Sequence, residues 1–436
     1  MTAHPFEISG CGRSQSAPTV PRFQFIHILI DRAYSREPNR NQLADSANMF
    51  HSVVLSMSVA VPASDYWEKS WIHCSAISGK QWLFPTVQTT MAYGKYWLVL
   101  VLFVACVSAA IAAQSTQLTQ GAVTSACHVS PIVSNLDKSA HFYHDIIGLD
   151  LVPTPEAGLL PWDTDQGHLD LHGLPRARLR FIGARMPGVF CGVELVEFAG
   201  AQQQKIRRRL QDPGAAMLFL IVRDIDAIFS RLKASGATVI TKGGAPMFVG
   251  PSKTARAVII QDPDGHFIEL AQLEPTPATT ATAESNVIGI RLRITVADSG
   301  KAADYYRQTL GIDAKPGAFT NDQSVMAMMG FPAAAEYRVG TSTLPGSQLV
   351  LELIEFRGVG ETKAVASRVQ DAGSYRLQLN VLDIDETLAA LKRAGSRVIS
   401  TGGSPVRMTF GSIPWRLAVV QDPNNLFLVV QQRLAL

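Results

Sequence analysis

The feature that most constrains the fold is an internal duplication. Four segments recur in the same order, and the turns that begin at Asp262 and Asp422 show the offset, 422 − 262 = 160 residues. The matched pairs are SNLDKSAHFYHDIIGLDL with VADSGKAADYYRQTLGIDA, MPGVFCGVELVEFAG with LPGSQLVLELIEFRG, VRDIDAIFSRLKASGATVITKGG with VLDIDETLAALKRAGSRVISTGG, and VIIQDPDGHFIELAQ with VVQDPNNLFLVVQQ. Residues 124–272 (module 1) and 287–432 (module 2) are therefore predicted to be two copies of one fold, joined by the Pro/Thr/Ala-rich linker 273–286.

Each module divides into two half-repeats that are predicted to be β-α-β-β-β units. In the first half of module 1, a strand at 128–133 precedes a helix over 136–147, which Asn135 can cap and Gly148 can end. The same signals recur along the chain: strands at 192–198, 218–222, 256–260 and 267–271, caps at Asp224, Asp298 and Asp383, and glycine stops at Gly236, Gly311 and Gly395.

Composition narrows the class of protein. The 436 residues allow about three domains. The net charge of +3 is too small to indicate nucleic acid as a partner. The cysteines form no CxxC pair, which excludes a zinc ribbon or a disulfide-stapled miniprotein: Cys11, Cys74, Cys106, Cys127 and Cys191. Any metal is therefore expected to be held by His and carboxylate side chains.

The segment 91–113 is predicted to be a signal peptide or membrane anchor. Residues 96–113, YWLVLVLFVACVSAAIAA, carry no charge and follow Lys95. A basic start, an apolar run and small terminal residues favour cleavage, and thus an exported, periplasmic or secreted protein. Because signals begin at the amino terminus, we expect Met91 to be the biological start and residues 1–90 to be a non-native or disordered extension. The alternative is a genuine tail before an uncleaved membrane anchor, the one case in which the membrane is a partner.

The repeated motifs resemble those of the vicinal oxygen chelate superfamily, which includes glyoxalases, bleomycin-resistance proteins and extradiol dioxygenases. The resemblance rests on SNLDKSAHFYHDIIGL, on the ELVEF strand and on DPDGHFIEL, and it covers about 126–272 and 287–432. It implies an α+β fold in which paired β-α-β-β-β units face each other and curl into open barrels. The superfamily hosts lyases, isomerases, dioxygenases and metal-free binding proteins, so the fold does not fix the reaction.

The resemblance also implies four inward-facing positions that can hold a metal. In module 1 they carry His128, Glu194, Met217 and Glu269. One imidazole and two carboxylates suit Zn²⁺, Mn²⁺, Fe²⁺, Co²⁺ or Ni²⁺, whereas the Met217 thioether is a poor ligand for a hard ion. The expected site has His128, Glu194 and Glu269 as ligands and open positions for a small-molecule substrate. Glu194 or Glu269 is the candidate catalytic carboxylate.

Module 2 lacks such a metal site. The matching positions carry Arg291, Glu352, Arg376 and Val429, and no histidine follows His266 in the chain. Arg291 and Arg376 are candidate substrate-binding residues for a carboxylate or phosphate, or they are neutralised by Glu352 and its neighbours.

The two modules can also pair by exchanging halves. In that arrangement His128 and Glu194 would face Arg376 and Val429, and no complete metal site would form. A metal-free binding protein would then be favoured.

Other polar residues are predicted to have structural or solvated roles. GHLDLHG (167–173) is predicted to be a solvated hairpin strand, with one of His168, Asp170 and His172 as a lesser candidate for reaching the metal. Cys127 and Cys191 are out of phase with the ligand positions on neighbouring strands, and their offset predicts that they are not bonded. The remaining histidines of module 1 are expected on an exposed helix face or pointing away from the cavity: His141, His144 and His266.

Three functions follow from these observations. The favoured hypothesis is an exported, metal-dependent lyase or isomerase of the glyoxalase type, in which a carboxylate moves a proton while the metal chelates two substrate oxygens. The alternatives are a metal-free binding or sequestering protein of the bleomycin-resistance type and an extradiol-type dioxygenase. A homodimer is left open as an assembly.

Overall fold

The computed structural model describes residues 56–57, 72–73, 122–154, 158 and 161–435. The chain divides into two units, 1–95 and 96–436, and only the second is described at length. In the first unit, strand β1 (Ser56–Met57) pairs with β2 (Ile72–His73). The predicted extension and the signal or anchor segment otherwise lie outside the described residues. Among the described residues, no helix combines the length and apolar character needed to cross a membrane.

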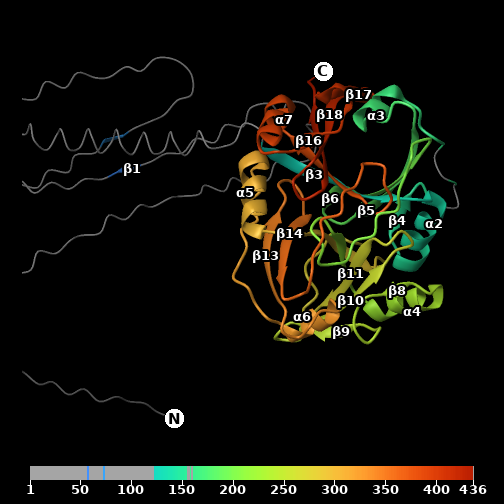
Figure 1. The fold of residues 1–436 in the computed structure, drawn as a ribbon, viewed down its shortest axis with the longest axis vertical. Coiled ribbons are helices and arrows are strands. Elements are labelled where there is room, and N and C mark those ends of the chain that lie inside the picture. Colours follow the sequence, from blue (N-terminus) through green and yellow to red (C-terminus); the bar gives the residue numbers. More distant parts are fainter. Residues whose placement is uncertain (1–55, 58–71, 74–121, 155–157, 159–160, 436) are drawn as a thin grey trace, which may run out of the picture. The chain divides into compact units, whose positions relative to one another are not determined.

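Two mixed β-sheets form the second unit (Figure 1). Sheet 1 has the strand order β16-β18-β19-β15-β3-β6-β5-β4, with β17 paired to β18. Its strands are β3 (Val123–Val133), β4 (Asp150–Val152), β5 (Arg178–Met186), β6 (Val189–Ala199), β15 (Tyr375–Val381), β16 (Arg397–Val398), β17 (Val406–Phe410), β18 (Ile413–Gln421) and β19 (Phe427–Arg433).

Sheet 2 has the order β13-β14-β12-β7-β11-β10-β8, with β9 paired to β10. Its strands are β7 (Ala216–Val222), β8 (Thr238–Val239), β9 (Met247–Val249), β10 (Ala255–Gln261), β11 (Phe267–Leu273), β12 (Val287–Thr295), β13 (Glu336–Thr343) and β14 (Val350–Arg357). The predicted α+β fold with paired β-α-β-β-β units is confirmed.

Each sheet combines half of module 1 with half of module 2. In sheet 1, β3 pairs antiparallel with β15, so that Val129 lies opposite Leu377. In sheet 2, β7 pairs antiparallel with β12, so that Leu218 lies opposite Leu292. The structure therefore has the exchanged pairing, and this decides which side chains share a concave face.

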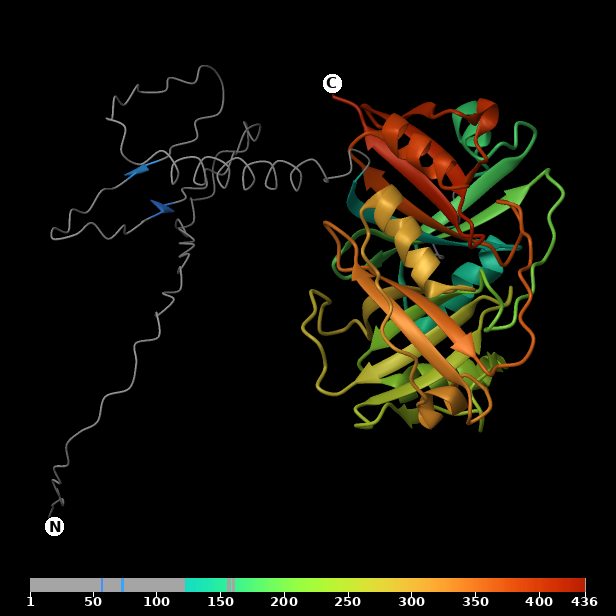
Figure 2. The same cartoon turned by 60° about the vertical axis from the view of Figure 1, so that its left-hand side comes forward.

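Four helical segments cover the convex faces of the sheets. The helix α2 (Leu136–His141), which continues as the π-helical η1 (Phe142–Ile147), contacts α4 (Ile225–Ser235), whereas α5 (Ser299–Leu310) contacts α7 (Ile384–Arg393). The two pairs lie on opposite sides of the unit (Figures 1 and 2). Side-chain carboxylates or amides cap each start as predicted: Asn135, Asp224, Asp298 and Asp383.

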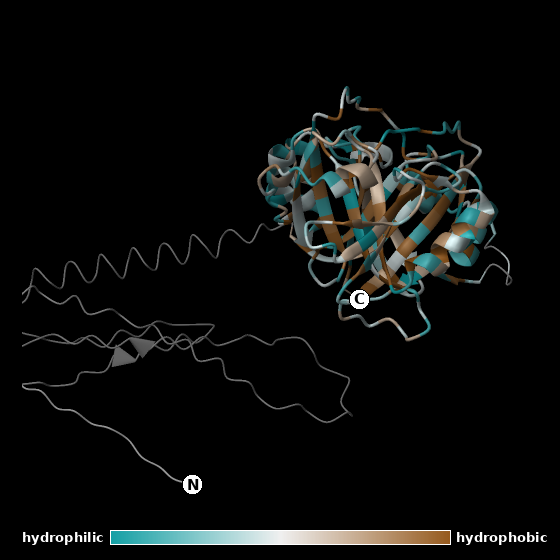
Figure 3. Cartoon of the chain, turned by 90° about the horizontal axis from the view of Figure 1, so that it is seen from below, coloured by the Kyte–Doolittle hydropathy of each residue, from teal (hydrophilic) through white to brown (hydrophobic). Residues whose placement is uncertain are grey.

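The main hydrophobic core lies between these helices and the strands. Figure 3 shows apolar residues concentrated along the strands and polar ones on outer helix surfaces and loops. Two equivalent buried hydrogen bonds join the halves: Tyr143 Oη donates to Asp262 Oδ2 at 3.1 Å, and Tyr306 Oη donates to Asp422 Oδ2 at 2.7 Å. The repeated aromatic and Asp-Pro motifs are thus partners in the core.

Short helices cover part of each concave face. The helix α3 (Gln166–Leu171) lies over sheet 1, α6 (Gln323–Met328) lies over sheet 2, and η3 (Thr401–Gly403) follows β16. Leu171 packs with Phe427 and Val429, which are inward residues of β19. The segment GHLDLHG is therefore helical rather than a hairpin strand, because Asp165 caps a turn whose leucines are buried. The prediction for that segment was wrong.

Candidate functional site

The concave face of sheet 1 carries a connected set of polar side chains from four strands. His128 on β3 lies beside Glu194 on β6, with 3.8 Å between Nδ1 and Oε1. Ser130 Oγ donates to Glu194 Oε2 at 3.1 Å. The side chains of His128 and Glu194 are 22% and 14% exposed, so a small molecule can reach them. Gly183 on β5 is paired with Glu194 and leaves open space where a side chain would stand.

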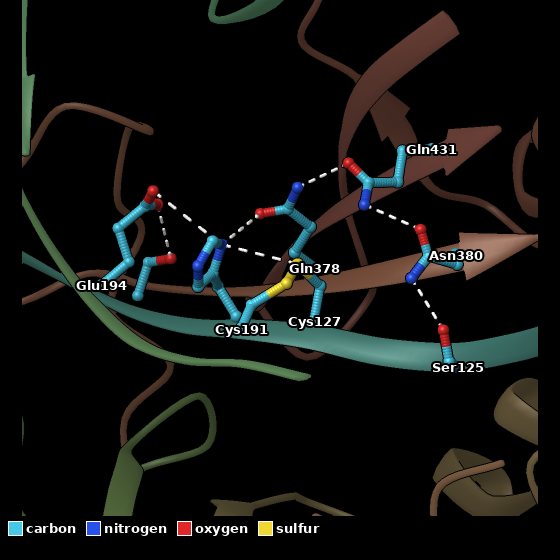
Figure 4. The surroundings of a disulfide bond; sticks show 9 residues. Ser125, Cys127, Cys191, Glu194, Gln378, Asn380 and Gln431 are labelled. Carbon is cyan, nitrogen blue, oxygen red and sulfur yellow. Dashed lines mark hydrogen bonds and ion pairs between the residues drawn. A yellow bond between two sulfur atoms is a disulfide. The ribbon is translucent and has the colours of Figure 1, made fainter. Parts of the chain in front are cut away.

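A chain of side-chain hydrogen bonds extends from His128 across the sheet (Figure 4). His128 Nδ1 donates to Gln378 Oε1 at 3.0 Å, and Gln378 Nε2 donates to Gln431 Oε1 at 2.5 Å. Gln431 Nε2 donates to Asn380 Oδ1 at 2.7 Å, and Asn380 Nδ2 donates to Ser125 Oγ at 2.7 Å. All the donors point in the same direction along this amide row, and such chains polarise their members cooperatively.

Arg376 on β15 completes the site from the other module. Its Nη2 donates to Glu194 Oε2 at 3.0 Å, and its Nη1 donates to His172 Nε2. His172 Nδ1 donates to the His168 carbonyl at 2.8 Å, which leaves Nε2 as the acceptor. Sequence reasoning ranked His172 low because it assigned the segment to a strand, and only the helical path of α3 brings this ring to Arg376.

Burial and the arginine set the charges of these groups. Burial, followed by the nearby Arg376 cation, holds the pKa of His172 well below its usual value, so the ring is neutral. Burial by itself would raise the pKa of Glu194, but His128 and Arg376 outweigh it and lower that pKa. Burial lowers the pKa of the Arg376 guanidinium, and Glu194 partly offsets this. The site therefore holds a carboxylate that is already paired with an internal cation.

A cavity of about 510 Å³ lies beside this concave face, between α3 and strands β17 and β18. Its lining includes Asp165, His168, Arg407 and Trp415. His168 is paired through Nδ1 with Asp163 Oδ2 at 2.5 Å, and it lies close enough to Glu194 to help lower the pKa of that carboxylate.

Glu269 lies on sheet 2, in a separate cluster of two acids and two arginines. Arg293 donates to Glu269 Oε2 at 2.5 Å and to Glu352 Oε2 at 2.6 Å, and Arg291 donates to Glu352 Oε1 at 2.8 Å. Both arginines also lie over the Phe219 ring, at 4.9 and 5.1 Å. Burial raises the pKa of Glu269, whereas Arg293 and Arg291 overcome burial and lower the pKa of Glu352. Two carboxylates are thus balanced by two guanidinium groups.

The structure does not bring the three predicted metal ligands together. His128 and Glu194 share sheet 1, but β11 carries Glu269 into sheet 2 because β11 pairs with β7. Met217 is buried on sheet 2 with the methionines of α6. Of the two predicted substrate-binding arginines, Arg376 contacts Glu194, and Arg291 is neutralised by Glu352.

The residues on sheet 1 do not fit a divalent ion of the kind that the predicted ligand set would hold. The third position carries the Arg376 cation bonded to Glu194, and the fourth carries Val429, which packs in an apolar cluster under α3. On sheet 2, Arg293 stands between the two carboxylates. A guanidinium group therefore supplies positive charge in both sites.

Cys127 and Cys191 form a disulfide, so the prediction that they are not bonded was wrong. The parallel register of β3 and β6 places His128 opposite Gly192, which brings the two preceding cysteines together with 4.7 Å between their Cα atoms. The phase of the side chains was read from the sequence, but the offset expected between the two strands differs from their actual register.

The other histidines are placed largely as predicted. His141 is 69% exposed on its helix and pairs with Asp145. His144 is partly buried, with Nδ1 at 2.9 Å from the Leu149 carbonyl. His266 points away from the concave face, where its Nε2 lies 2.9 Å from the Ile132 carbonyl and its ring packs on Tyr375.

Comparisons with known proteins identify a family match and several similar proteins. Residues 126–270 match the family model of the Glyoxalase/Bleomycin resistance protein/Dioxygenase superfamily. A 2-epi-5-epi-valiolone epimerase from an Actinomyces species is 29% identical over 149 residues, which are 34% of this chain and 78% of that protein. Glyoxalase I from Zea mays is 17% identical, and the match covers 72% of this chain and 92% of the glyoxalase chain, with a TM-score of 0.43. A Mn(II)-bound glyoxalase from Novosphingobium aromaticivorans is 14% identical, and the match covers 72% of this chain and 93% of that protein's chain, with a TM-score of 0.22.

The family match lies within module 1, and it covers strands β3 to β6 of sheet 1 and strands β7 to β11 of sheet 2. On this ground, residues 126–270 are assigned to the Glyoxalase/Bleomycin resistance protein/Dioxygenase superfamily.

Proposed function

We propose that this protein binds a small, polar, hydroxyl-rich molecule on the concave face of sheet 1 without a divalent metal. The observation that carries the proposal is the ion pair between Arg376 and Glu194, 3.0 Å long, at the position where the superfamily resemblance implies a metal ligand. A buried guanidinium so close to the carboxylate repels a divalent cation and satisfies the negative charge that would attract one.

The amide row supports a hydroxyl-rich ligand. Amide and hydroxyl side chains both donate and accept hydrogen bonds, as sugar-like hydroxyl groups do. Gln378, Asn380 and Ser125 are only partly buried, and they continue the polar face away from His128. The similarity to a 2-epi-5-epi-valiolone epimerase supports that compound as the first probe.

A metal-free isomerase is the second candidate. His128 and Glu194 form an imidazole and carboxylate pair at 3.8 Å that a small molecule can reach, and such a pair can accept a proton from one carbon and return it. In this function Glu194 would be the base, and Arg376 would stabilise its charged form. The metal-dependent lyase and the extradiol dioxygenase have less support, because neither sheet gathers the expected ligand set.

Export remains part of the proposal. The Cys127–Cys191 disulfide supports an oxidising compartment such as the periplasm or the exterior. The uncharged segment 96–113 supports a secretory signal, and a retained membrane anchor is the alternative. Isolation of the native protein by compartment, followed by sequencing of its amino terminus, tests this part.

Binding and metal content test the proposed function together. Protein with its disulfide intact is analysed for metals and then titrated calorimetrically with 2-epi-5-epi-valiolone and with inositol, before and after treatment with a chelator. We expect less than stoichiometric metal and binding that the chelator does not change. Gln378→Leu should weaken binding by up to about tenfold, since one lost hydrogen bond typically costs about 0.5–1.5 kcal/mol.

Gln323→Leu, an exposed glutamine on α6, is the matched control and should bind normally. One equivalent of metal per chain that is lost in His128→Ala would overturn the metal-free reading. Turnover of the epimerase substrate that is abolished by Glu194→Gln would favour the isomerase over the binding protein.

A further inference from the structure

Two sulfur atoms and an imidazole nitrogen gather at the edge of the sheet 1 site. The donor atoms of Cys127, His128 and Cys191 all lie within 4.8 Å of one another. His128 Nδ1 is 3.6 Å from Cys127 Sγ. Figure 4 shows the disulfide beside Gln378 and Glu194. The proposed function uses the imidazole and the carboxylate but gives the sulfurs no role.

These spacings are close to those of a tetrahedral zinc site. With Zn–S near 2.3 Å and Zn–N near 2.0–2.1 Å, tetrahedral geometry separates a sulfur donor from a nitrogen donor by about 3.6 Å. The distance from Cys127 Sγ to His128 Nδ1 already has this value. The two sulfurs would need to separate to about 3.8 Å, which requires the covalent bond between them to break.

We propose that reduction of the Cys127–Cys191 disulfide converts this corner of the site into a zinc site with two thiolates and the His128 imidazole as ligands. The site differs from the ligand set that the superfamily resemblance implies, because both sulfurs come from positions outside that set. It also differs from the metal-free state proposed above, which concerns the protein with its disulfide intact. The two proposals can fail separately.

Reduction of the disulfide requires a dithiol reductant. The dithiol gives two electrons and two protons, the bond between the sulfurs breaks, the cysteines become thiols, and the reductant closes its own disulfide. Zinc binding then releases two protons as the thiols become thiolates. His128 binds as a neutral ring through Nδ1, so its proton moves to Nε2 and its hydrogen bond to Gln378 is lost.

A carboxylate is available as the fourth ligand. Glu194 Oε1 is 3.8 Å from His128 Nδ1, within about 0.5 Å of the separation of two such donors on one tetrahedral zinc ion. Two thiolates and one carboxylate against Zn²⁺ leave one negative charge, and Arg376, 3.0 Å from Glu194, offsets it. The same arginine that opposes a metal bound by Glu194 and His128 alone can therefore stabilise a site that carries two additional thiolates.

Cobalt binding to the full chain tests the proposal. The protein is reduced anaerobically with a dithiol, freed of reductant and titrated with Co²⁺, a spectroscopic substitute for zinc, and the oxidised protein is titrated in parallel. We expect one equivalent to bind the reduced protein, with the thiolate-to-cobalt charge-transfer band and strong visible bands of tetrahedral cobalt. The oxidised protein should show neither band, and Zn²⁺ should displace the cobalt.

Variants assign the ligands. The double variant C127S/C191S should lose the thiolate band while keeping Cys11, Cys74 and Cys106, which serve as internal control thiols. His128→Ala should weaken cobalt binding beyond the roughly tenfold to hundredfold loss that outer-shell changes cause. His141→Ala, which removes an exposed helix histidine, should bind like the unchanged protein.

Three results would overturn the proposal. The first is a reduced protein with no thiolate band, and the second is a band that persists in the double cysteine variant. The third is reduction that abolishes the circular dichroism of the sheets, since the site requires the register of β3 and β6. Circular dichroism of each variant before reduction separates a folding defect from loss of a ligand.

Discussion

Removal of Arg293 should strongly destabilise the protein, because one guanidinium neutralises two buried carboxylates. The side chains of Glu269 and Glu352 are only 5% and 3% exposed, and Arg293 contacts them at 2.5 and 2.6 Å. The perturbation is Arg293→Met, which keeps most of the side-chain length and removes the charge. Arg291 still pairs with Glu352 in this variant, so Glu269 is the acid left without a partner.

The expected loss follows from the burial of these groups. Breaking a buried ion pair by removing one partner costs about 3–5 kcal/mol, because an uncompensated charge stays in the interior. An exposed pair contributes only about 0.2–1 kcal/mol. Arg416 and Asp385 form such a pair, with Asp385 64% exposed, and Arg416→Met is therefore the matched control. The two substitutions are chemically identical and differ in burial.

Urea unfolding followed by circular dichroism measures both variants at pH 7. We expect Arg293→Met to lose several times more free energy of unfolding than Arg416→Met. A triple variant E269Q/R293M/E352Q should recover much of the loss, since it leaves no buried charge at the two acids. Equal losses in the two single variants would refute the argument, and so would a triple variant less stable than Arg293→Met.

The pH dependence gives a second check on the same variant. Burial already raises the pKa of Glu269, and loss of the arginine raises it further. A carboxyl group whose pKa is higher in the folded than in the unfolded state stabilises the fold at pH values below its unfolded-state pKa. That contribution is lost as the pH rises through its folded-state pKa. The deficit of Arg293→Met should therefore shrink as the pH falls from neutral towards 4. A deficit that grows on acidification would contradict the reasoning.

Three further predictions address other parts of the molecule. Burial raises the pKa of Asp422 from 3.8 to about 6, so its contribution to stability is lost as the pH rises through about 6. Between pH 4 and 7, the free energy of unfolding of Asp422→Asn should therefore gain about 2 kcal/mol relative to the unchanged protein, and parallel pH profiles would contradict this. The double variant R376H/V429E rebuilds a four-ligand set with His128 and Glu194, so with its disulfide intact it should bind about one equivalent of Co²⁺. A variant that binds no more Co²⁺ than the unchanged protein would contradict this. Reduction of the disulfide, which closes a sequence separation of 64 residues, should lower the free energy of unfolding by about 2–4 kcal/mol, and unchanged urea midpoints would refute that estimate.

Local features of this protein were readable from the sequence because they depend on neighbouring residues. A side-chain carboxylate or amide oxygen at the start of a helix accepts a hydrogen bond from the backbone N–H three residues later, whatever the tertiary fold. Asn135 and Asp224 cap their helices in this way, as predicted. The repeat of apolar strands and capped helices likewise indicated two copies of one fold and the superfamily. The inward positions of His128 and Glu194 were implied by the resemblance to the superfamily, and the structure places these two side chains together.

The helix over GHLDLHG was not readable in this way. The alternation of His168, Asp170 and His172 indicates a strand, but the short helix α3 is stabilised by contacts with residues that are distant in the sequence. Leu171 packs against residues of β19, and His172 bonds to Arg376, 204 positions away. Such contacts override a weak local pattern of so few residues.

The sequence by itself determined the main strands and capped helices, the duplication and the family resemblance, since these depend on composition and spacing along the chain. Only the tertiary structure decided which half of each module pairs with which, because equivalent halves of two copies offer the same strand edges and apolar faces to either partner. That choice moves Glu269 away from His128, brings Arg376 to Glu194 and sets the register that joins Cys127 to Cys191. The chemistry of the site therefore depends on the pairing of segments about 250 residues apart, such as His128 and Gln378.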